Sequence, residues 1–406
     1  MSSNNTNHDT ALYLTAEQAA EQLGISVTTL YAYVSRKNIR SVKVEGSRSR
    51  RYWAQDIERL SSNKINESIH PPSINEHVIS NQSGITLITE QGIYYRGKSV
   101  IELAETATIE EVAAFLWEQP DIFNQPALEF NQQAIQLLDA TSNLSPIEQA
   151  ISLFSFLEYT QPHAYDLSPQ GYARTGVDAL RSFAAIIVNG KPENTPLHQY
   201  LAKHLNLDEP FHDLLRRQMI LSVDHELDPT TFAVRAAAQT GITPYGAAIS
   251  GLVAYRGRHI NLVRINSVTQ LIKELCTAND PCVPILNRYR QDEVIPGYDK
   301  NIHDIADPRA DHLLEAMSSV LNHDPDFLKL LKANQMVFDL TGKPPGFILL
   351  SAFLGFKFGL ISKEMAFVGL SRLVGWIAHA CEQYHQGPNI RARANYVGSL
   401  PIDKER

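Results

Sequence analysis

Residues 370–398 have the sequence LSRLVGWIAHACEQYHQGPNIRARANYVG, an apolar segment followed by a basic tail. The apolar half has helical spacing and carries one arginine, Arg372, whereas the tail carries Arg391 and Arg393. An arginine on an apolar helix is seldom buried without a partner, and its planar fork fits a carboxylate or a phosphate. We therefore expect Arg372 either to pair with an internal Asp or Glu or to hold a ligand anion.

Helical spacing of apolar residues also dominates the chain from residue 85 onward. It recurs in residues 109–117, 177–188, 214–223, 230–239, 245–255 and 364–382. Strand signals are short, at 85–87, 93–95 and 390–397, and we find neither an internal repeat nor a glycine-rich phosphate loop. The sequence thus predicts a large, mainly α body.

The first sixty residues follow a different pattern. Thr15 with Gln18 is the signature of a capping box for a short helix, which Gly24 ends. Ser26 can cap a second helix over residues 27–35. Two short helices joined by a tight, glycine-containing turn are typical of a helix-turn-helix.

A wing and a basic cluster follow the second helix. Residues 42–44 and 50–53 predict a β-hairpin, and Asp56 begins a last helix. Residues 36–51 contain seven Lys or Arg against one acidic residue, in a chain of formal net charge −8. Such a cluster suits a phosphate backbone, although a basic face on a small protein-binding module is an alternative. For a DNA-binding domain we expect contacts from Thr28, Thr29, Tyr31, Arg36, Lys43, Arg48, Arg50 and Arg51.

The composition predicts a protein of two or three domains in a reducing compartment. The chain has 406 residues, 44% of them hydrophobic and 20% charged, enough for a large core. Its three cysteines, Cys276, Cys282 and Cys381, are scattered, which argues against a disulfide framework or a zinc site. Residues 1–10 lack a signal-peptide pattern, and the longest apolar run, 346–361, is too short for a bilayer. We expect a cytoplasmic protein without membrane contact or a metal.

The N-terminal segment resembles the winged helix-turn-helix of the MerR and excisionase families. The matching residues are Leu14 to Ala20, Leu23 to Ser26, Thr29 to Tyr31 and Arg51 to Tyr52. This resemblance covers about residues 13–60 and implies a DNA-binding fold. The next residues, 61–83, are rich in Ser and Asn and contain Pro71 and Pro72, as is typical of a linker.

The body resembles the citrate synthase family through most of residues 85–398. The matching motifs, in the family's order, are Tyr94 to Gly97 with Ile101 to Ala104, Val177 to Ser182, Asp224 to Leu227 with Thr230 to Phe232, Ile295 to Tyr298, Asp307 to Ala310 and Arg372 to His379. This resemblance implies a homodimer of subunits with a large and a smaller helical domain. The expected parts are a winged helix-turn-helix over 11–60, a linker over 61–83, a large domain over 84–263 and 341–406, and a small domain over 264–340.

Citrate synthases join the acetyl group of acetyl-CoA to oxaloacetate, and they use an Asp and two His to move protons and stabilise charge. The resemblance places Ile260 and Lys300 where the family has the two His, and Gly346 where it has the Asp. His259 lies one residue from the first of these positions. Ile and Gly carry no proton, and losing one group of such a set already costs orders of magnitude in rate.

The family's carboxylate-binding arginines are kept. The resemblance implies anion-binding roles for Arg309, Arg372, Arg391 and Arg393, with the tail arginines reaching the partner subunit's site, and it places Ser222 where the family has a further His that touches oxaloacetate. A structural role remains open for each arginine. Asp307 with Pro308 is typical of a helix N-terminus, so Arg309 can also pair with a neighbour.

These residues favour one function and leave two alternatives open. The favoured one is a transcriptional regulator that binds double-stranded DNA and senses an oxaloacetate- or citrate-like di- or tricarboxylate without turnover and without a cofactor. An active citrate or 2-methylcitrate synthase is the second hypothesis, and it would use acyl-CoA and give new roles to His259, Lys300 or His303. The third is a structural dimeriser that binds no ligand.

Overall fold

The computed structural model describes residues 13–36, 39–44, 47, 49–54, 56–57, 60, 82–90, 92–298, 307–360, 363–387 and 390, without the side chains of residues 35, 36 and 260. Two compact units make up the chain, Met1–Ser80 and Asn81–Arg406. Helices dominate the second unit, the body, so the expectation of a mainly α protein is confirmed.

In the first unit two helices pack with a small antiparallel sheet of strand order β1-β3-β2. The elements are β1 (Tyr13–Leu14), α2 (Ala16–Gln22), α3 (Val27–Arg36), β2 (Ser41–Lys43) and β3 (Arg50–Trp53). Their core consists of Ala19, Ala20, Leu23, Leu30, Ile39, Tyr52 and Ile57. Strands β2 and β3 form the predicted wing, and residues 54, 56, 57 and 60 are helical.

Local signals set the ends of both helices of this unit. The predicted capping box is present, because Thr15 Oγ1 accepts from the N–H of Gln18 while the Gln18 side chain accepts from the N–H of Thr15. Gly24, with φ +60°, makes the left-handed turn that a side chain would disfavour. Ser26 then caps α3 by accepting from the N–H of Thr29 at 3.1 Å.

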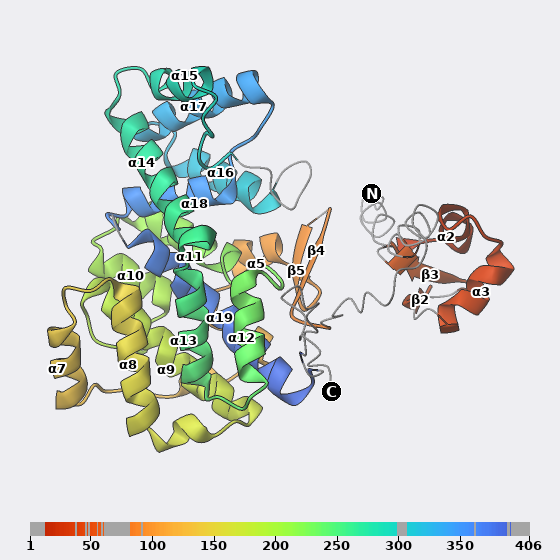
Figure 1. Cartoon of the computed structure of the whole chain (residues 1–406), viewed down its shortest axis with the longest axis horizontal. Coiled ribbons are helices and arrows are strands. Elements are labelled where there is room, and N and C mark those ends of the chain that lie inside the picture. The colour runs from red at the N-terminus through yellow and green to blue at the C-terminus, as the bar shows by residue number, and fades with distance from the viewer. Residues whose placement is uncertain are drawn as a thin grey trace, which may run out of the picture. The chain divides into compact units, whose positions relative to one another are not determined.

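The body begins with a three-stranded antiparallel sheet of order β4-β5-β6 and continues as helices (Figure 1). The strands are β4 (Thr86–Thr89), β5 (Gly92–Tyr95) and β6 (Lys98–Ser99). The helices are α5 (Val100–Thr106), α6 (Ile109–Trp117), α7 (Gln132–Ala140), α8 (Pro146–Thr160), α9 (Pro169–Val188), α10 (Leu197–His204), α11 (Glu209–Leu221), α12 (Pro229–Ala238), α13 (Pro244–Tyr255), α14 (Val263–Thr277), α15 (Cys282–Arg290), α16 (Pro308–Val320), α17 (Pro325–Thr341), α18 (Phe347–Lys357) and α19 (Glu364–His385). Short turns of 3₁₀ and π helix occur at Ile122–Asn124, Pro162–Tyr165 and Arg258–Leu262.

Helix α19, which contains the first half of the opening segment, is the centre of the body. It packs against α6, α9, α12 and α13, and the last three of these lie beside it in Figure 1. A Cβ on Gly375 would lie 2.6 Å from Asp224 Oδ1, closer than atoms can approach. This glycine therefore lets the turn after α11 lie directly on α19 and brings Asp224 against the helix that carries Arg372.

The helices α14 to α17 gather at one end of the body, at the top of Figure 1. Residues 264–340, expected to form the small domain, supply most of them. Helix α16 packs on α5 and α11, and α18 packs on both α14 and α16. The start of α16 and the start of α18 therefore face the large set of helices, where a cavity forms. In the described part of the chain we find no helix with the length and apolar character that crossing a membrane requires.

Candidate functional site

A cavity of about 340 Å³ lies among the turn after α11, the end of α13, the start of α14, the first turns of α16 and α18, and the first half of α19. Its lining residues are Ser222, His225, Asp228, Pro229, Tyr255, Asn261, Arg264, Ile265, Gly297, Asp307, Arg309, Gly346, Phe347, Ile348, Ser351, Ala352, Glu364, Val368 and Arg372. Among them, three arginines stand against three acidic residues. An anionic ligand can therefore bind in two ways. It can displace an internal carboxylate from an arginine, or it can bind N–H groups that the internal ion pairs do not use. The volume is at the lower end for ligand pockets and suits a small metabolite.

Arg372 is buried at the cavity wall and has internal partners. Its Nη2 donates to Asp228 Oδ2 at 2.6 Å and to Thr231 Oγ1 at 2.9 Å, and its guanidinium carbon lies 6.0 Å from the centre of the Trp376 ring. The internal pair foreseen for this arginine is therefore present. Because the same residue also lines the cavity, a ligand carboxylate would meet it in competition with Asp228.

The guanidinium of Arg309 is held by Asp307, the N-cap residue of the same helix. Asp307 caps α16 and accepts from Arg309 Nε at 3.0 Å and Nη2 at 2.8 Å. Burial raises the pKa of Asp307, but the adjacent Arg309 more than offsets this and leaves that pKa below its usual value. Among the described residues no partner reaches Arg309 Nη1, so the bidentate pair fixes the guanidinium and leaves one donor edge for a ligand.

His225 presents a neutral ring to the cavity. No hydrogen bond reaches this ring from the described residues. Burial, together with the charges of Arg309 and Arg372, lowers the pKa of His225 to about 3. At neutral pH the imidazole thus offers one N–H donor and one acceptor to a ligand, and it is a very weak base.

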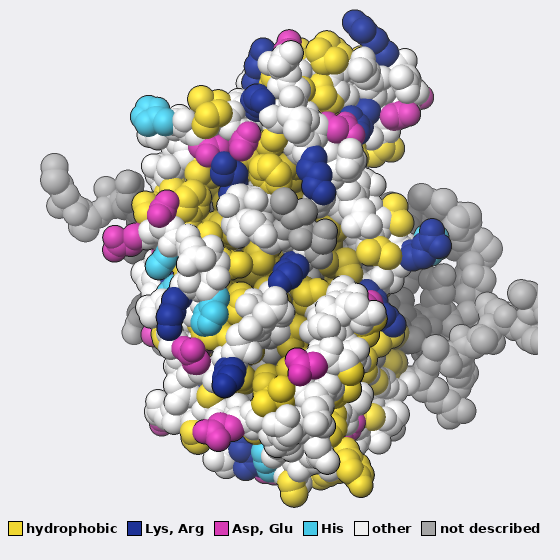
Figure 2. All heavy atoms as spheres, turned by 90° about the vertical axis from the view of Figure 1, so that its left-hand side faces the viewer, with side chains coloured by type: hydrophobic (Ala, Val, Ile, Leu, Met, Phe, Trp, Pro, Cys, Tyr) yellow, Lys and Arg dark blue, Asp and Glu magenta, His cyan; other side chains and the backbone are white. Residues whose placement is uncertain are grey.

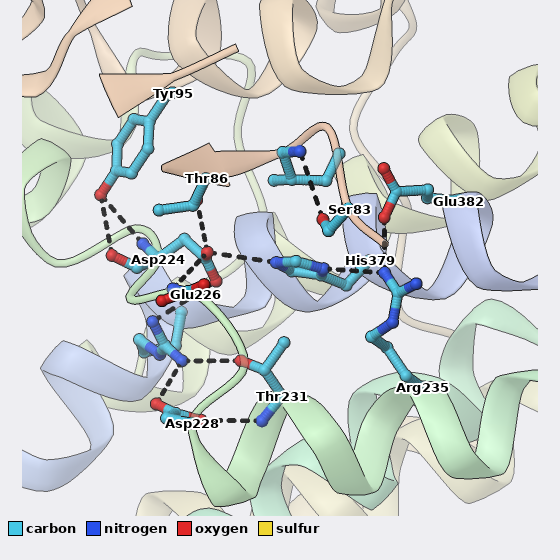
Figure 3. A network of polar contacts seen from close by, with 12 residues as sticks. Ser83, Thr86, Tyr95, Asp224, Glu226, Asp228, Thr231, Arg235, His379 and Glu382 are labelled. Carbon is cyan, nitrogen blue, oxygen red and sulfur yellow. Dashed lines mark hydrogen bonds and ion pairs between the residues drawn. The ribbon is translucent and has the colours of Figure 1, made fainter. Parts of the chain in front are cut away.

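A second carboxylate near Arg372 belongs to the fully buried Asp224, which Figure 3 shows among its partners. It accepts from Thr86 Oγ1 at 2.5 Å and from His379 Nε2 at 3.1 Å, and Arg372 Nη1 lies 3.5 Å from it. Burial alone raises the pKa of Asp224, but His379, Arg372 and Thr86 outweigh it and hold this pKa well below its usual range. Asp224 is therefore ionised at neutral pH. Its negative charge partly offsets the positive charge that Arg372 presents to the cavity.

The polar contacts continue from His379 to the entrance of the body's sheet (Figure 3). Arg235 Nη1 lies 3.2 Å from His379 Nδ1, and because an arginine only donates, that ring nitrogen accepts. Arg235 also contacts Glu382 Oε2 at 2.5 Å and the carbonyl of Gln82 at 3.0 Å, while Glu382 Oε1 accepts from the N–H of Gly84 at 2.7 Å. A chain of buried charges thus joins the cavity wall to the residues that follow the predicted linker.

Only some of the other residues expected at the site of the body line the cavity. Ser222 lines the cavity, but its hydroxyl already donates to the carbonyl of Gln218 at 2.8 Å. Gly346 also lines it, at the N-terminus of α18, whereas His259 is exposed and is not among the lining residues. The side chain of Ile260 and the residues Lys300, His303, Arg391 and Arg393 lie outside the described part of the chain.

In the first unit the candidate DNA contacts fall on α3 and the wing. Thr28, Thr29 and Lys43 are exposed, and Tyr31 keeps 58% of its surface in solvent. Arg50 is exposed and donates to Ser41 Oγ at 3.0 Å.

Two arginines of the basic cluster behave differently from Arg50. Arg51 is half-buried. Arg40 forms a bidentate pair with the buried Asp56, so its guanidinium has a structural role. Arg48 and the side chain of Arg36 lie outside the described residues. By contrast, basic, acidic and apolar side chains are mixed on the face of the body that Figure 2 shows.

Comparison with known proteins identifies the two parts. A family model described as "Citrate synthase, C-terminal domain" matches residues 75–393. The chain belongs to the citrate synthase family. A second model, described as "Helix-turn-helix domain", matches residues 13–61. The expected fusion of a helix-turn-helix domain with a citrate-synthase-like body is therefore confirmed.

The relatives are named citrate synthases. The chain is 24% identical over 356 residues to "Citrate synthase 2" of Bacillus subtilis, covering 80% of this chain and 95% of that protein. It is equally 24% identical over 356 residues to the "Citrate/2-methylcitrate synthase" of the same organism, covering 79% and 95%. Among solved structures, citrate synthase from Pyrobaculum aerophilum has a TM-score of 0.69 at 18% identity, covering 80% of this chain and 92% of that chain. The ternary complex of citrate synthase from Thermoplasma acidophilum has a TM-score of 0.63 at 19% identity, covering 80% and 96%. These structures show that the body has the citrate synthase fold.

Sequence reasoning missed several residues of the cavity. His225 and Asp228 lie in the segment that carries the resemblance around Asp224 to Phe232, yet neither was assigned a role. The signal for Asp228 was its place before Pro229, which is typical of a helix N-cap. For Ser351 we find no sequence signal, because only the fold shows that its hydroxyl is buried and has no hydrogen-bond partner in the described part of the chain.

Proposed function

We propose that the protein is a DNA-binding transcriptional regulator whose citrate-synthase-like body binds a di- or tricarboxylate without turning it over. The observation that carries this proposal is Gly346. It lines the cavity at the position where the family resemblance implies the catalytic Asp, and it has no group that can take a proton. The helix-turn-helix domain supplies the second half of the proposal.

Three of the remaining titratable groups of the cavity, namely Asp228, Asp307 and His225, are poorly suited to the reaction. Asp228 and Asp307 are tied to Arg372 and Arg309 by short hydrogen bonds. The pKa of His225, about 3, lies far from neutral, whereas a general base works best with a pKa near the operating pH. These features support binding without turnover, that is, a pseudoenzyme.

Anion binding has its own support. Arg309 is fixed by Asp307 and keeps one donor edge, so little side-chain freedom is lost when a ligand carboxylate docks. Arg372 offers a second guanidinium at the same cavity. Neither role requires a cofactor.

The buried chain of charges supplies a physical route for regulation. A ligand that draws Arg372 away from Asp228 changes the field on Asp224, which contacts His379 and, through it, Arg235 and Glu382. Glu382 holds Gly84, directly after the linker. We propose that the body forms a homodimer, so that two helix-turn-helix domains read half-sites one helical turn, about 10 base pairs, or a multiple apart.

Two measurements test this proposal. Footprinting of the purified full chain on genomic fragments should yield a specific, two-part protected site, and the absence of any protected site contradicts the regulator. Release of CoA thiol should stay at background when acetyl-CoA or propionyl-CoA is mixed with oxaloacetate or other 2-oxo acids. Turnover above background contradicts a body that only binds.

The alternative is an active citrate or 2-methylcitrate synthase. Its support is the relatives' names and the length of the family match. It needs a base from a residue such as His259, Lys300 or His303, and His259 does not line the cavity. The same thiol assay separates the two functions, and an acyl-CoA requirement belongs only to the alternative.

A further inference from the structure

We infer that the cavity binds one ligand carboxylate at the N-terminus of α18, in addition to the carboxylates that Arg309 and Arg372 bind. The ligand is then a tricarboxylate. This inference rests on the proposed function of the body as a carboxylate sensor and names the ligand class within it. Three structural features carry it: an uncapped helix N-terminus, an unpaired buried hydroxyl, and the placement of both in the cavity wall.

Helix α18 begins at the cavity without a side-chain cap. Its N-cap, Gly346, has extended backbone angles (φ −82°, ψ 159°) and no side chain that could accept from the first turn. The N–H of Gly346 donates to the carbonyl of Gly297 at 2.8 Å, whereas no partner from the described residues reaches the N–H groups of Phe347 and Ile348. All these residues line the cavity. Free N–H groups at the positive end of a helix dipole stabilise an anion.

Ser351, one turn into α18, gives an independent indication of a ligand. Only 5% of its surface is exposed, its Oγ has no hydrogen-bond partner among the residues that the structure describes, and the residue lines the same cavity. A helical serine without another partner often donates to the carbonyl four residues earlier, as Ser222 does to Gln218. Side chains on a helix lean toward its N-terminus, so the Ser351 hydroxyl lies over the first turn of α18. A ligand oxygen there would satisfy this hydroxyl together with the free N–H groups.

The position of Arg309 places the new subsite next to the anion subsite proposed above. The guanidinium carbon of Arg309 lies 4.6 Å from the centre of the Phe347 ring, so Arg309 and the first turn of α18 are neighbours. Asp228, Asp307 and Glu364 also line the cavity, and their charge disfavours an anion at any place that lacks its own donors. Among the described lining residues, Arg309, Arg372 and the α18 N-terminus with Ser351 are three separate donor groups that match three carboxylates, and Arg264 is a further cation of the wall.

The test compares tricarballylate with succinate, which lacks the third carboxylate, by calorimetric titration of the full chain. We expect wild-type protein to bind tricarballylate at least about tenfold more tightly than succinate. Ser351→Ala should reduce this ratio about three- to tenfold. Ser318→Ala is the matched control, because its hydroxyl donates to the Leu314 carbonyl at 2.7 Å on α16, away from the cavity, and it should leave the ratio unchanged.

Gly346→Asp gives a second, independent variant. The introduced carboxylate would cap α18 itself and repel the ligand's third carboxylate, so we expect the ratio to fall to about one. Gly346→Asn has the same shape without the charge and should reduce the ratio less.

The outcomes separate the inference from the function on which it rests. A wild-type ratio near one, or a ratio that neither Ser351→Ala nor Gly346→Asp lowers, overturns the α18 subsite and leaves carboxylate sensing intact. Binding of neither probe to the wild type overturns the sensor itself. Tight tricarballylate binding that both variants weaken selectively supports both.

Discussion

Asp228 uses one carboxylate for two purposes. Oδ2 accepts from Arg372 at 2.6 Å, at the cavity wall, while Oδ1 accepts from the N–H of Thr231 at 2.8 Å and caps α12. The cap needs an oxygen, but only the pair with Arg372 needs the negative charge. The two roles can therefore be separated by a substitution that keeps the shape and removes the charge.

Asp228→Asn should raise the affinity for citrate about tenfold, because a ligand carboxylate no longer displaces an internal one from Arg372. Asn caps a helix about as well as Asp, so the cap of α12 should persist, but the buried Arg372 loses a charged partner, and the free energy of unfolding should fall by about 1–3 kcal/mol. Calorimetric titration and urea unfolding measure the two quantities. Asp228→Ala, which also removes the cap, should lower the free energy of unfolding by about a further 1 kcal/mol. An affinity that Asp228→Asn leaves unchanged would show that Asp228 does not compete with the ligand.

His225 should make the folded state sensitive to acid. Its pKa is about 3 in the folded protein and about 6.5 in an unfolded chain, so between these values the unfolded state binds more protons. Stability is therefore greatest above about pH 6.5 and falls as the pH drops toward 3, by at most about 1.4 kcal/mol per pH unit from this group. Urea unfolding at pH 7.5 and pH 5 should show a smaller loss in His225→Gln than in wild type. Equal losses would contradict a neutral, half-buried His225.

Local residue patterns predicted the ends of helices, but not the partners of charged side chains. Thr15 with Gln18 and Asp307 with Pro308 act within one turn of chain, and the structure has both caps. Arg372 meets Asp228 across 144 residues, and His379 meets Asp224 across 155. Periodicity shows which face of a helix is buried and leaves open what lies opposite that face. The sequence could therefore offer an internal partner or a ligand for Arg372 without choosing between them.

At the scale of elements, α19 and α12 join the cavity to the start of the body's sheet. Glu382 on α19 pairs with Arg235 on α12 and accepts from the N–H of Gly84. Only 12% of the Glu382 side chain and none of the Arg235 side chain is exposed, so solvent screens this pair weakly. The pair therefore links two helices and the chain that enters β4.

Glu382→Gln should lower the free energy of unfolding by about 3 kcal/mol, because it leaves Arg235 buried with less compensation. Its amide oxygen can still accept from Gly84, so the fold should persist. If the pair transmits the ligand signal, citrate binding should stay within about twofold of wild type, while the effect of citrate on DNA affinity shrinks. Urea unfolding, calorimetry and fluorescence anisotropy measure these three quantities.

Glu148→Gln is the matched control for this variant. Glu148 pairs with Arg256 at 2.8 Å, with 33% and 42% of the two side chains exposed. Such a pair contributes about 0–1 kcal/mol, so stability and the citrate effect on DNA should remain near wild type. An undiminished citrate effect in Glu382→Gln would exclude this route between cavity and linker.

The wing of the first unit should contribute charge more than sequence recognition. Lys43 is exposed at the end of β2, and a lysine contacts phosphate as a point charge. Lys43→Ala should weaken binding to specific and random duplexes alike and reduce the slope of log affinity against log salt by about 1. Anisotropy titrations over a salt series measure the slope. Lys203→Ala, at an exposed position of α10 in the body, is the control, and an equal loss there would remove the wing from the interface.

At the scale of the whole molecule, the fusion of the two parts has a function if ligand binding to the body changes the DNA affinity of the helix-turn-helix domain. Domain closure around an anion and release or capture of DNA then bias the same equilibrium. The sequence supplied both halves of this argument through two resemblances. It could not supply the buried charges between them, because these arise only when α12, α19 and the start of β4 come together.

Thermodynamic linkage requires the coupling to be reciprocal. If citrate changes DNA affinity by some factor, DNA must change citrate affinity by the same factor, and allosteric factors commonly lie between about 5 and 150. We expect such a factor when anisotropy is measured on the footprinted site with and without saturating citrate. Calorimetry with and without saturating DNA should return the same value at the same salt concentration, which must be fixed because DNA affinity depends steeply on it. Unequal factors would mean that citrate acts on the DNA or on ionic strength, whereas a factor of one in both directions would leave the cavity without a regulatory role.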